Sequence, residues 1–376
     1  MKARQDTPLD VVVIGGGIAG LAATAALADN LKPCLVEREP VLASHASGRN
    51  AAIFRPLESE STTSALAQRS MQLMDSQLGL AHQGLLSKGL VLGFGSADAA
   101  RVEARRAAAL GVAHQHLDGQ SLRDVVPSLS GGTMQAGLWL EDGGVLDIHG
   151  ITQGLADLAR RRGAHVRVGT EVVRLRLTHG RVEGVELATG AFLPCAHVVL
   201  AAGAWSAGLA ARCGVPLPLR PIRRHLVHLG WSGPAPAGTR AWPVVWRQDV
   251  EVYFRPEGAG LLASPCDETH YPDPNSLTSQ PDKVALELLA ERLRVTAPAL
   301  EQLAVRSSWG CFRTFAADRE LVLGADPRVQ GLHWLCGLGG RGMSVGIAAG
   351  ELLAQRLLAG EQPANCPFRI ERLLGV

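Results

Sequence analysis

The sequence predicts an α/β fold in which a parallel sheet and an antiparallel sheet form separate parts. The parallel sheet is indicated by residues 11–14, VVVI, a short β-branched run typical of a strand covered on both faces. The antiparallel sheet is indicated by alternating segments such as KGLVLGF at 88–94 and VEVYFRPEGAGLLAS at 250–264. A length of 376 residues accommodates about two domains.

The composition, 47% apolar and 19% charged, is that of a globular protein with a sizeable core. A formal net charge of +2 predicts no affinity for nucleic acid, which requires a concentrated basic face. The seven cysteines form no CxxC pair and the twelve histidines show no metal-ligand spacing, so we expect reduced thiols and no metal. The apolar run 11–28 contains four glycines and is too broken to span a membrane. We therefore expect a soluble, cytoplasmic protein without a transmembrane segment.

The motif GGGIAG at residues 15–20 follows the first strand and opens an Ala/Leu-rich helix. Gly15 allows a tight turn, Gly17 lets the backbone approach a pyrophosphate, and Gly20 lets the helix pack close to the strand. The N-terminus of the helix attracts phosphate charge. The next strand ends in Glu37, which can accept hydrogen bonds from ribose hydroxyls. This order predicts a Rossmann-like nucleotide site, although the unit alone does not separate NAD from FAD.

The stretch SHASGRNAAIF, residues 44–54, has the composition of neither a core strand nor a charged surface helix. A nicotinamide dehydrogenase usually continues from its second strand into another crossover, whereas this chain inserts small residues around Arg49 and Asn50. Small residues let backbone N–H groups crowd round phosphates and a ring edge, and Arg49 can add charge. The alternative is a plain surface loop.

Further elements follow along the chain. Asp147 is placed to cap a helix at 148–162. Residues 172–189 predict a hairpin that turns at 179–180. Residues 198–203, VVLAAG, have the composition of another buried strand, ending beside the nucleotide.

These segments resemble the FAD-dependent D-amino-acid oxidase and dehydrogenase superfamily, which includes glycine and sarcosine oxidases, and are closest in pattern to the D-arginine dehydrogenases. The motifs arrive in family order: VVIGGGIAG, LVERE, SGRNAA, GVLDIHGITQGLADLARRRGAHV, GTEVVRL, VVLAAGAWS, RPIRRH, VYFRPEG, GCFRTFAADREL and GLGGRGMSVGIAAGELLA. The resemblance implies a discontinuous Rossmann-like FAD-binding domain, formed by residues 1–80, 146–213 and 311–376. It implies an antiparallel-sheet substrate-binding domain, formed by residues 81–145 and 214–310.

The resemblance also implies which residues hold FAD. They are the glycine turn and the acid with its neighbour, the small-residue stretch, a backbone contact to adenine, a strand end and a second glycine-rich turn: Gly15, Gly17, Ala19, Gly20, Glu37, Arg38, Ala46, Ser47, Gly48, Arg49, Asn50, Ala51, Ala52, Ile53, Val172, Gly203, Gly339, Gly340, Arg341, Gly342, Met343 and Ser344. The last turn precedes a small-residue helix, whose N-terminus can point at the flavin oxygen where charge gathers on reduction. Cys311 occupies a position that forms a thioether to flavin in sarcosine-oxidase-like relatives. We expect non-covalent FAD, because only nearby arginines could activate this thiol.

The implied reaction is oxidation of the C–N bond of an amino acid, foremost a D-amino acid, by hydride transfer to flavin. The resulting imino acid hydrolyses to a 2-oxo acid. Arg224 and Arg313 are implied to bind the substrate carboxylate, with the Tyr253 hydroxyl nearby. From the residues alone, Arg224 could be surface charge and Tyr253 an ordinary sheet aromatic.

Other functions on the same fold stay open. They are a 2-hydroxyacid or N-methyl-amine oxidoreductase, and a flavoprotein subunit of a heteromeric dehydrogenase. The electron acceptor is oxygen or a quinone, and the sequence does not separate the two.

The pocket departs from the arginine-preferring relatives at three positions. Their guanidinium-binding glutamate falls at or near Gly89, their lid tyrosine at Glu58, and a small polar residue at Arg55. Arg55 and Arg341 could favour an acidic substrate. Glu58 could instead recruit a basic one, or Arg55 and Glu58 could pair with each other.

Overall fold

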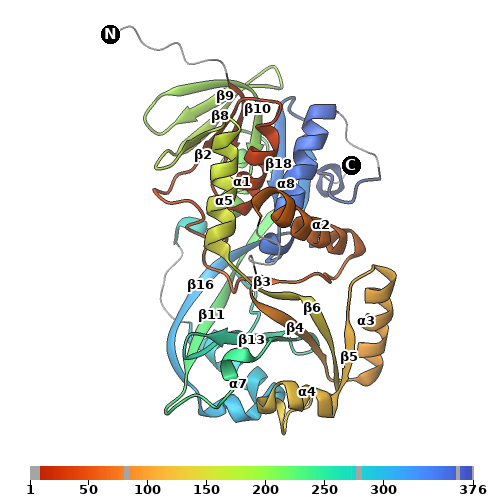
Figure 1. Ribbon diagram of the computed structural model, residues 1–376. Coiled ribbons are helices and arrows are strands. Elements are labelled where there is room, and N and C mark those ends of the chain that lie inside the picture. The colour runs from red at the N-terminus through yellow and green to blue at the C-terminus, as the bar shows by residue number, and fades with distance from the viewer. Residues whose placement is uncertain (1–8, 80–84, 272, 277–281, 361–364, 375–376) are drawn as a thin grey trace.

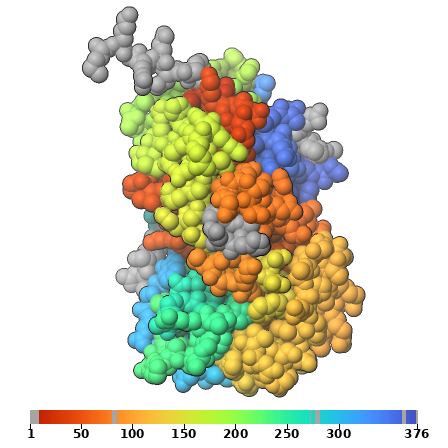
Figure 2. Space-filling model, viewed as in Figure 1, coloured from red at the N-terminus to blue at the C-terminus, as the bar shows by residue number. Residues whose placement is uncertain are grey.

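The computed structural model describes residues 9–79, 85–271, 273–276, 282–360 and 365–374. Its strands form two large sheets, one in the upper and one in the lower half of Figure 1, and the predicted α/β fold class is confirmed. The space-filling view shows the upper and lower halves meeting across the middle of the molecule (Figure 2). Within the described residues, no helix combines the length and the apolar character needed to cross a membrane.

The first sheet has the predicted nucleotide-binding strand at its centre. β1 (Leu9–Ile14) pairs in parallel with β2 (Pro33–Val36) on one side and with β10 (Phe192–Leu200) on the other. Beyond β10 lie β18 (Leu332–Cys336) and β17 (Val322–Ala325), and beyond β2 lies β7 (His165–Arg167). The predicted hairpin is confirmed as β8 (Val172–Thr178) and β9 (Arg181–Leu187), which extends from β10. His179 and Gly180 both have positive φ in its turn, as a two-residue hairpin loop requires.

Both faces of this sheet are covered, which explains its unbroken β-branched strands. Val11 and Val13 pack with the helices α1 (Ile18–Leu27), α5 (Ile148–Arg161) and α8 (Gly342–Ala359), whereas Val12 packs with the hairpin and α6 (Ser206–Arg212). α2 (Ser61–Leu78) packs against α8 and α5 on the helical side.

The second sheet is largely antiparallel and carries the long pair β11 (Leu219–Gly230) and β16 (Ala304–Ala316). The order from β11 continues through β14 (Gly260–Ser264), β13 (Val252–Glu257), β12 (Val244–Arg247), β4 (Leu85–Phe94), β6 (Ala136–Leu146) and β3 (Ile53–Phe54), with β15 (Thr269–His270) and β5 (Gln115–Asp118) at the margins. Its helices are α3 (Ala97–Ala109), α4 (Gly119–Val125) and α7 (Lys283–Thr296). The register places Arg224 opposite Cys311 and Ile222 opposite Arg313, so these four side chains share one face.

The chain passes between the two sheets several times. The small-residue stretch follows β2 of the first sheet and ends in β3 at the edge of the second, and β16 leads back into β17 of the first. The predicted domain boundary at 311 falls inside β16, which pairs with β11 along its length. The limits at residues 1, 80, 81 and 376 lie outside the described residues, and the two-domain division stays a prediction.

Candidate active site

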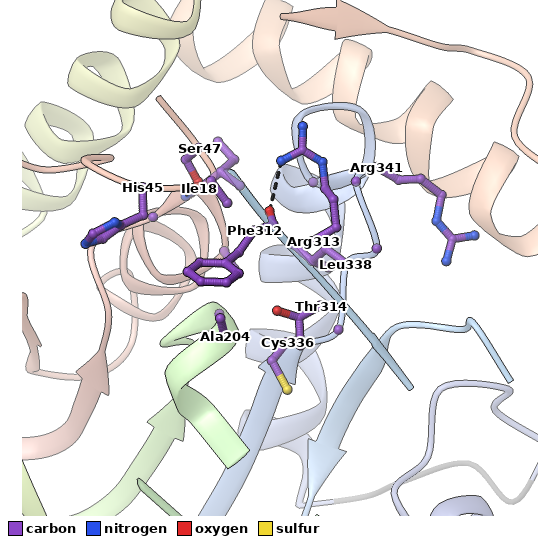
Figure 3. Close-up of a pocket in the computed structure, with 18 of the residues that line it drawn as sticks. Ile18, His45, Ser47, Ala204, Phe312, Arg313, Thr314, Cys336, Leu338 and Arg341 are labelled. Carbon is purple, nitrogen blue, oxygen red and sulfur yellow. Dashed lines mark hydrogen bonds between the residues drawn. The ribbon is translucent and has the colours of Figure 1, made fainter. Parts of the chain in front are cut away.

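A cavity of about 520 Å³ takes its walls from both sheets. The first sheet contributes the end of β1 and the residues that follow β10, with the start of α1 beside them. The second sheet contributes side chains of β11, β13 and β16. Figure 3 shows where these segments meet, with Ile18 and Ser47 from the N-terminal part of the chain beside Phe312, Arg313 and Thr314 of β16. The cavity therefore joins the predicted nucleotide site to the predicted substrate site.

The nucleotide end of the cavity is built around the first turn of α1. Gly15 follows β1 with φ of +112°, a conformation that favours glycine. The backbone N–H of Ile18 donates a hydrogen bond to Ser47 Oγ at 2.9 Å. This contact holds the stretch 44–54 against the positive end of the helix, where an anion is stabilised.

Gly17 and Gly20 face different neighbours. A Cβ at Gly17 would lie 3.0 Å from Ser47 Oγ, beside the cavity. A Cβ at Gly20 would lie 1.9 Å from the carbonyl oxygen of Gly15. Gly20 therefore permits the close helix–strand approach that the sequence predicts. Gly17, in contrast, leaves the cavity unobstructed beside Ser47.

Glu37 lies just beyond β2 at the same edge of the sheet. Its carboxylate accepts hydrogen bonds from the backbone N–H groups of Gly16, at 2.5 Å, and Glu39, at 2.8 Å. Since a carboxylate offers about four acceptor positions, Glu37 can also accept from a ribose hydroxyl. Val172, at the start of β8, lines the same end of the cavity.

Most residues assigned to the cofactor from the sequence line this cavity. They are Gly15, Gly17, Ala19, Glu37, Arg38, Ala46, Ser47, Asn50, Ala51, Ile53, Val172, Gly203, Gly339, Gly340, Arg341, Gly342, Met343 and Ser344. Gly20, Gly48, Arg49 and Ala52 lie outside the lining. Gly48 lets the loop close on itself, because a Cβ there would lie 2.3 Å from the carbonyl oxygen of Ala43.

The shape of the cavity fits FAD. It runs from the N-terminus of one helix, α1, to the N-terminus of another, α8, whose first residue, Gly342, is also in the lining. Such an arrangement offers one positive helix end to a pyrophosphate and a second to the far end of a long ligand. Gly17 and Gly340 have no side chains that could narrow the cavity. A Cβ at Gly17 would contact Ser47, and a Cβ at Gly340 would contact Arg313.

At the other end of the cavity, Arg313 is buried without a carboxylate partner among the described residues. Its Nη1 donates to the carbonyl oxygen of Phe312 at 2.9 Å, a bond drawn in Figure 3, and to Cys311 Sγ at 3.1 Å. No hydrogen bond within the described part of the chain engages its Nε or Nη2. This free edge has the fork geometry that binds a carboxylate with two parallel hydrogen bonds.

The free edge of Arg313 and one nitrogen of Arg224 converge on Gly340. A Cβ at Gly340 would lie 3.2 Å from Arg313 Nε and 3.7 Å from Arg224 Nη1. The other edge of Arg224 is held in place, because Nε donates to the carbonyl oxygen of Asp267 at 3.3 Å and Nη2 to Glu268 at 2.8 Å. Arg224 is therefore a buried member of the site rather than surface charge.

Tyr253 completes this end of the cavity. Its side chain is buried on β13, and burial raises its pKa to about 12. The hydroxyl therefore stays protonated at neutral pH and can donate a hydrogen bond. Its ring packs on Trp246, with 4.7 Å between the ring centroids.

An ion-pair chain leads from this end of the cavity to solvent. Glu268 binds Arg224 on one side and Arg319 on the other, with Nη2–Oε1 distances of 2.8 and 2.7 Å. Side-chain exposure falls from 56% at Arg319 through 32% at Glu268 to 11% at Arg224. Hydrogen bonds from Arg319 lower the pKa of Glu268, which stays ionised at neutral pH. Arg341, also in the lining, donates to the carbonyl oxygen of Arg319.

The departures from the arginine-preferring pattern occupy different places. Arg55 and Glu58 line the cavity next to each other, and Arg55 Nη2 lies 3.9 Å from Glu58 Oε2. Gly89 lies outside the lining, with φ of +101° and the ring of Trp139 where a Cβ would be. Of the three pocket departures, the structure therefore brings two into the cavity.

Several residues of this cavity were not predicted from the sequence. Trp205 lies under the Arg38 guanidinium, 4.7 Å from its ring centroid, and packs on His45. Trp246 similarly lies under Arg55, at 4.3 Å. Glu268 comes from the loop after β14 and carried no motif. Only the motif VVLAAGAWS, which contains Trp205, offered a signal.

A parallel nucleotide-binding sheet and an antiparallel sheet that enclose one long cavity define the class of two-part flavin oxidoreductases. The FAD dependent oxidoreductase family profile matches residues 10–356. The chain belongs to this family, and it is an FAD-dependent enzyme.

Among curated proteins, the chain is 28% identical to sarcosine oxidase subunit beta of Rhizobium meliloti (strain 1021), over 98% of this chain and 90% of that protein. It is 25% identical to the mitochondrial pyruvate dehydrogenase phosphatase regulatory subunit of Mus musculus, over 94% of this chain and 42% of that protein. It is 28% identical to a D-amino acid dehydrogenase of Methylobacterium sp. (strain 4-46), over 68% and 59%. The chain thus spans nearly all of one relative and less than two thirds of the other two.

Solved structures show the same fold. L-proline dehydrogenase from P. horikoshii superposes with a TM-score of 0.83 at 20% identity, covering 95% of both chains. Glycine oxidase from Bacillus cereus superposes with a TM-score of 0.77 at 21% identity, covering 94% of this chain and 96% of that one.

Proposed function

We propose that this enzyme oxidises the C–N bond of an amino acid, foremost a D-amino acid, and that the imino acid product hydrolyses to a 2-oxo acid. The observation that carries the proposal is the convergence of unpaired donors from Arg313 and Arg224 at Gly340, in the cavity that also fits FAD. Relatives named for sarcosine, glycine, proline and D-amino acids support an amino-acid substrate.

In the mechanism that we propose, bound FAD supplies the hydride acceptor. Arg313 binds the substrate carboxylate through Nε and Nη2, and Arg224 adds Nη1 as a third donor. The protonated hydroxyl of Tyr253 donates a further hydrogen bond. Fixing one end of the substrate in this way orients its α-carbon and lowers the entropic cost of reaction. We propose that the buried walls exclude bulk water, and no side chain is needed as a general base.

The cofactor assignments made from the sequence, from Gly15 to Ser344, are part of this proposal, as are the two-domain division and a cytoplasmic location. Gly48 and Arg49, which lie outside the cavity lining, would act by shaping the stretch 44–54.

A second candidate is oxidation of an N-methyl amine. It is favoured by the 28% identity to sarcosine oxidase subunit beta, which extends over 90% of that protein. The same carboxylate site would serve, since only the group on nitrogen differs. A subunit role within a heteromeric dehydrogenase is compatible with either chemistry.

The test is an anaerobic flavin-reduction screen with D- and L-amino acids, N-methylglycine and 2-hydroxyacids. We expect loss of the flavin absorbance near its visible maximum with one or more amino acids. Reduction by N-methylglycine alone would select the second candidate, and reduction by 2-hydroxyacids alone would overturn the proposal. Reoxidation of the reduced enzyme by oxygen or by a soluble quinone then separates the two acceptors.

A further inference from the structure

Arg55 is a largely enclosed arginine whose guanidinium makes very few hydrogen bonds. Its side chain is 12% exposed and lines the cavity. Within the described residues, its only side-chain hydrogen bond runs from Nη2 to the carbonyl oxygen of Leu57, at 3.3 Å. Its Nε is buried and has no partner there. A guanidinium carries five N–H donors, so most of the hydrogen-bonding capacity of Arg55 is unused.

The neighbouring carboxyl group of Glu58 does not accept a hydrogen bond from Arg55. Glu58 Oε2 lies 3.9 Å from Arg55 Nη2, which is an ion-pair distance but too long for a hydrogen bond. The Glu58 side chain is 2% exposed, and burial raises its pKa against the opposing charges of Arg55 and Arg341. The pair therefore lowers the local charge without saturating the donors of Arg55.

Arg247 shows how a buried guanidinium away from the cavity is satisfied in this structure. Arg247, with 5% of its side chain exposed, makes four hydrogen bonds, two to Asp249 and one each to Thr133 Oγ1 and the carbonyl oxygen of Val295. A buried charged donor without partners is costly. Arg55, like Arg313, has its unused donors in the cavity lining, which points to a ligand in the cavity that supplies the missing acceptors.

Arg55 belongs to the same chamber as the carboxylate-binding pair. Its guanidinium carbon lies 4.3 Å from the ring centroid of Trp246, and that ring packs on Tyr253. Cys266 also lines this cavity, and its thiol is within the electrostatic influence of both Arg224 and Arg55. Burial raises the pKa of its thiol to about 11, and the charges of Arg224 and Arg55 both act against that shift.

We propose that Arg55 binds a second carboxylate of the substrate, so that this enzyme acts on amino acids or secondary amines that carry two carboxylates. This inference rests on the proposed function, because it takes Arg313 and Arg224 as the site of the first carboxylate. A carboxylate suits Arg55 better than a phosphate, since a doubly charged group beside Glu58 would meet stronger repulsion. A basic side chain is disfavoured, because Glu58 already faces Arg55 and Arg341.

The test compares mono- and dicarboxylates as ligands of the oxidised holoenzyme. Propionate and butyrate are titrated against malonate, succinate and glutarate, and binding is measured by calorimetry and by the shift of the flavin spectrum. We expect at least one dicarboxylate to bind about tenfold more tightly than the monocarboxylates, since it adds a charged hydrogen-bonded contact. Anaerobic flavin reduction by aspartate, glutamate and iminodiacetate should exceed that by alanine at equal concentration.

Two variants locate the effect. In Arg55→Gln the advantage of the dicarboxylate should fall below about twofold, while propionate binding stays within twofold of wild type. Arg294→Gln is the matched control, because Arg294 is 64% exposed and pairs with Glu301 away from the cavity. Arg294→Gln should bind the dicarboxylate as much more tightly than propionate as the wild type does. Both variants are checked for bound FAD before titration.

The outcomes separate this inference from the proposed function. Equal affinity for mono- and dicarboxylates overturns the second site and leaves the first intact. A dicarboxylate advantage that survives in Arg55→Gln overturns the assignment to Arg55. Failure of every carboxylate to bind overturns the proposed function and, with it, this inference.

Discussion

A single glycine, Gly340, lies against both arginines that we assign to the substrate carboxylate, Arg313 and Arg224. Gly340 has φ of +89°, and a Cβ there would lie 3.0 Å from Arg313 Cδ. We expect Gly340→Ala to lower kcat/KM about tenfold or more, because a small displacement of a substrate-binding group costs much of its orienting effect. Steady-state kinetics with a flavin spectrum checks this. An unchanged kcat/KM in Gly340→Ala would show that Arg313 and Arg224 do not bind the substrate on the side that lies against Gly340.

Removing one of these arginines should be more severe. Arg313→Leu deletes a charged and largely desolvated hydrogen-bond donor, at a cost of about 3 kcal/mol, or over a hundredfold in kcat/KM. FAD should remain bound. Arg294→Leu, at an exposed position, serves as the control and should keep wild-type kinetics. A near-normal kcat/KM in Arg313→Leu with intact flavin would refute the assigned role.

Glu58 makes stability depend on pH. Burial raises its pKa above the ordinary value of 4.5, so the stability that Glu58 contributes is fully present below that value and is lost as pH rises through the folded pKa. The melting temperature of Glu58→Gln relative to wild type should therefore rise from pH 4.5 to pH 8. It is measured with saturating FAD.

The control for this experiment is Glu287→Gln, since Glu287 is 65% exposed and forms an ion pair with Lys283. Its melting temperature relative to wild type should change little over the same range. A flat or falling difference for Glu58→Gln would mean that the pKa of Glu58 is not raised.

At the scale of an element, the predicted cap of α5 is confirmed. Asp147 Oδ1 accepts a hydrogen bond from the backbone N–H of Gly150 at 2.8 Å. Asp147→Ala should reduce the free energy of unfolding by about 1 kcal/mol, the usual cost of a lost N-cap. Chemical denaturation measures it, and Asp147→Asn should retain most of the stability. Equal losses in both variants would point to a role other than capping.

The elements that the sequence predicted well were those with local signals. The β-branched strand, the glycine turn, the hairpin at 179–180 and the helix after Asp147 each depend on neighbours in the chain. The positions of Trp246 and Glu268 depend instead on which strands and loops pair in the sheet. Sequence patterns without a partner strand do not specify that, so these parts of the cavity went unpredicted. From the sequence alone, Arg55 could either favour an acidic substrate or pair with Glu58, and its unused donors in the structure separate these alternatives.

For the whole molecule, FAD binding should be strong but reversible. Cys311 is buried behind Arg313, whose Nη1 contacts its sulfur, and it is absent from the cavity lining. We therefore expect acid precipitation to release yellow colour into the supernatant. A yellow pellet that turns colourless in Cys311→Ser would contradict this.

Reversible binding also predicts stabilisation by mass action. At a free FAD concentration of 100 Kd, the holoprotein should be more stable than the apoprotein by about 2.7 kcal/mol. Thermal unfolding with increasing FAD measures this. A melting temperature that does not depend on FAD concentration would show that the cofactor is not in exchange.

The strand order of the first sheet has a consequence for how the enzyme is made in the cell. β1 lies beside β10, and β10 lies beside β18, although β18 comes more than 300 residues after β1. At about 5–20 residues per second, the ribosome delivers β18 roughly 15 to 65 s after β1. During that interval the glycine turn and the first helix lack α8, against which α1 packs. Nascent chains should therefore depend on chaperones and acquire FAD only near the end of translation.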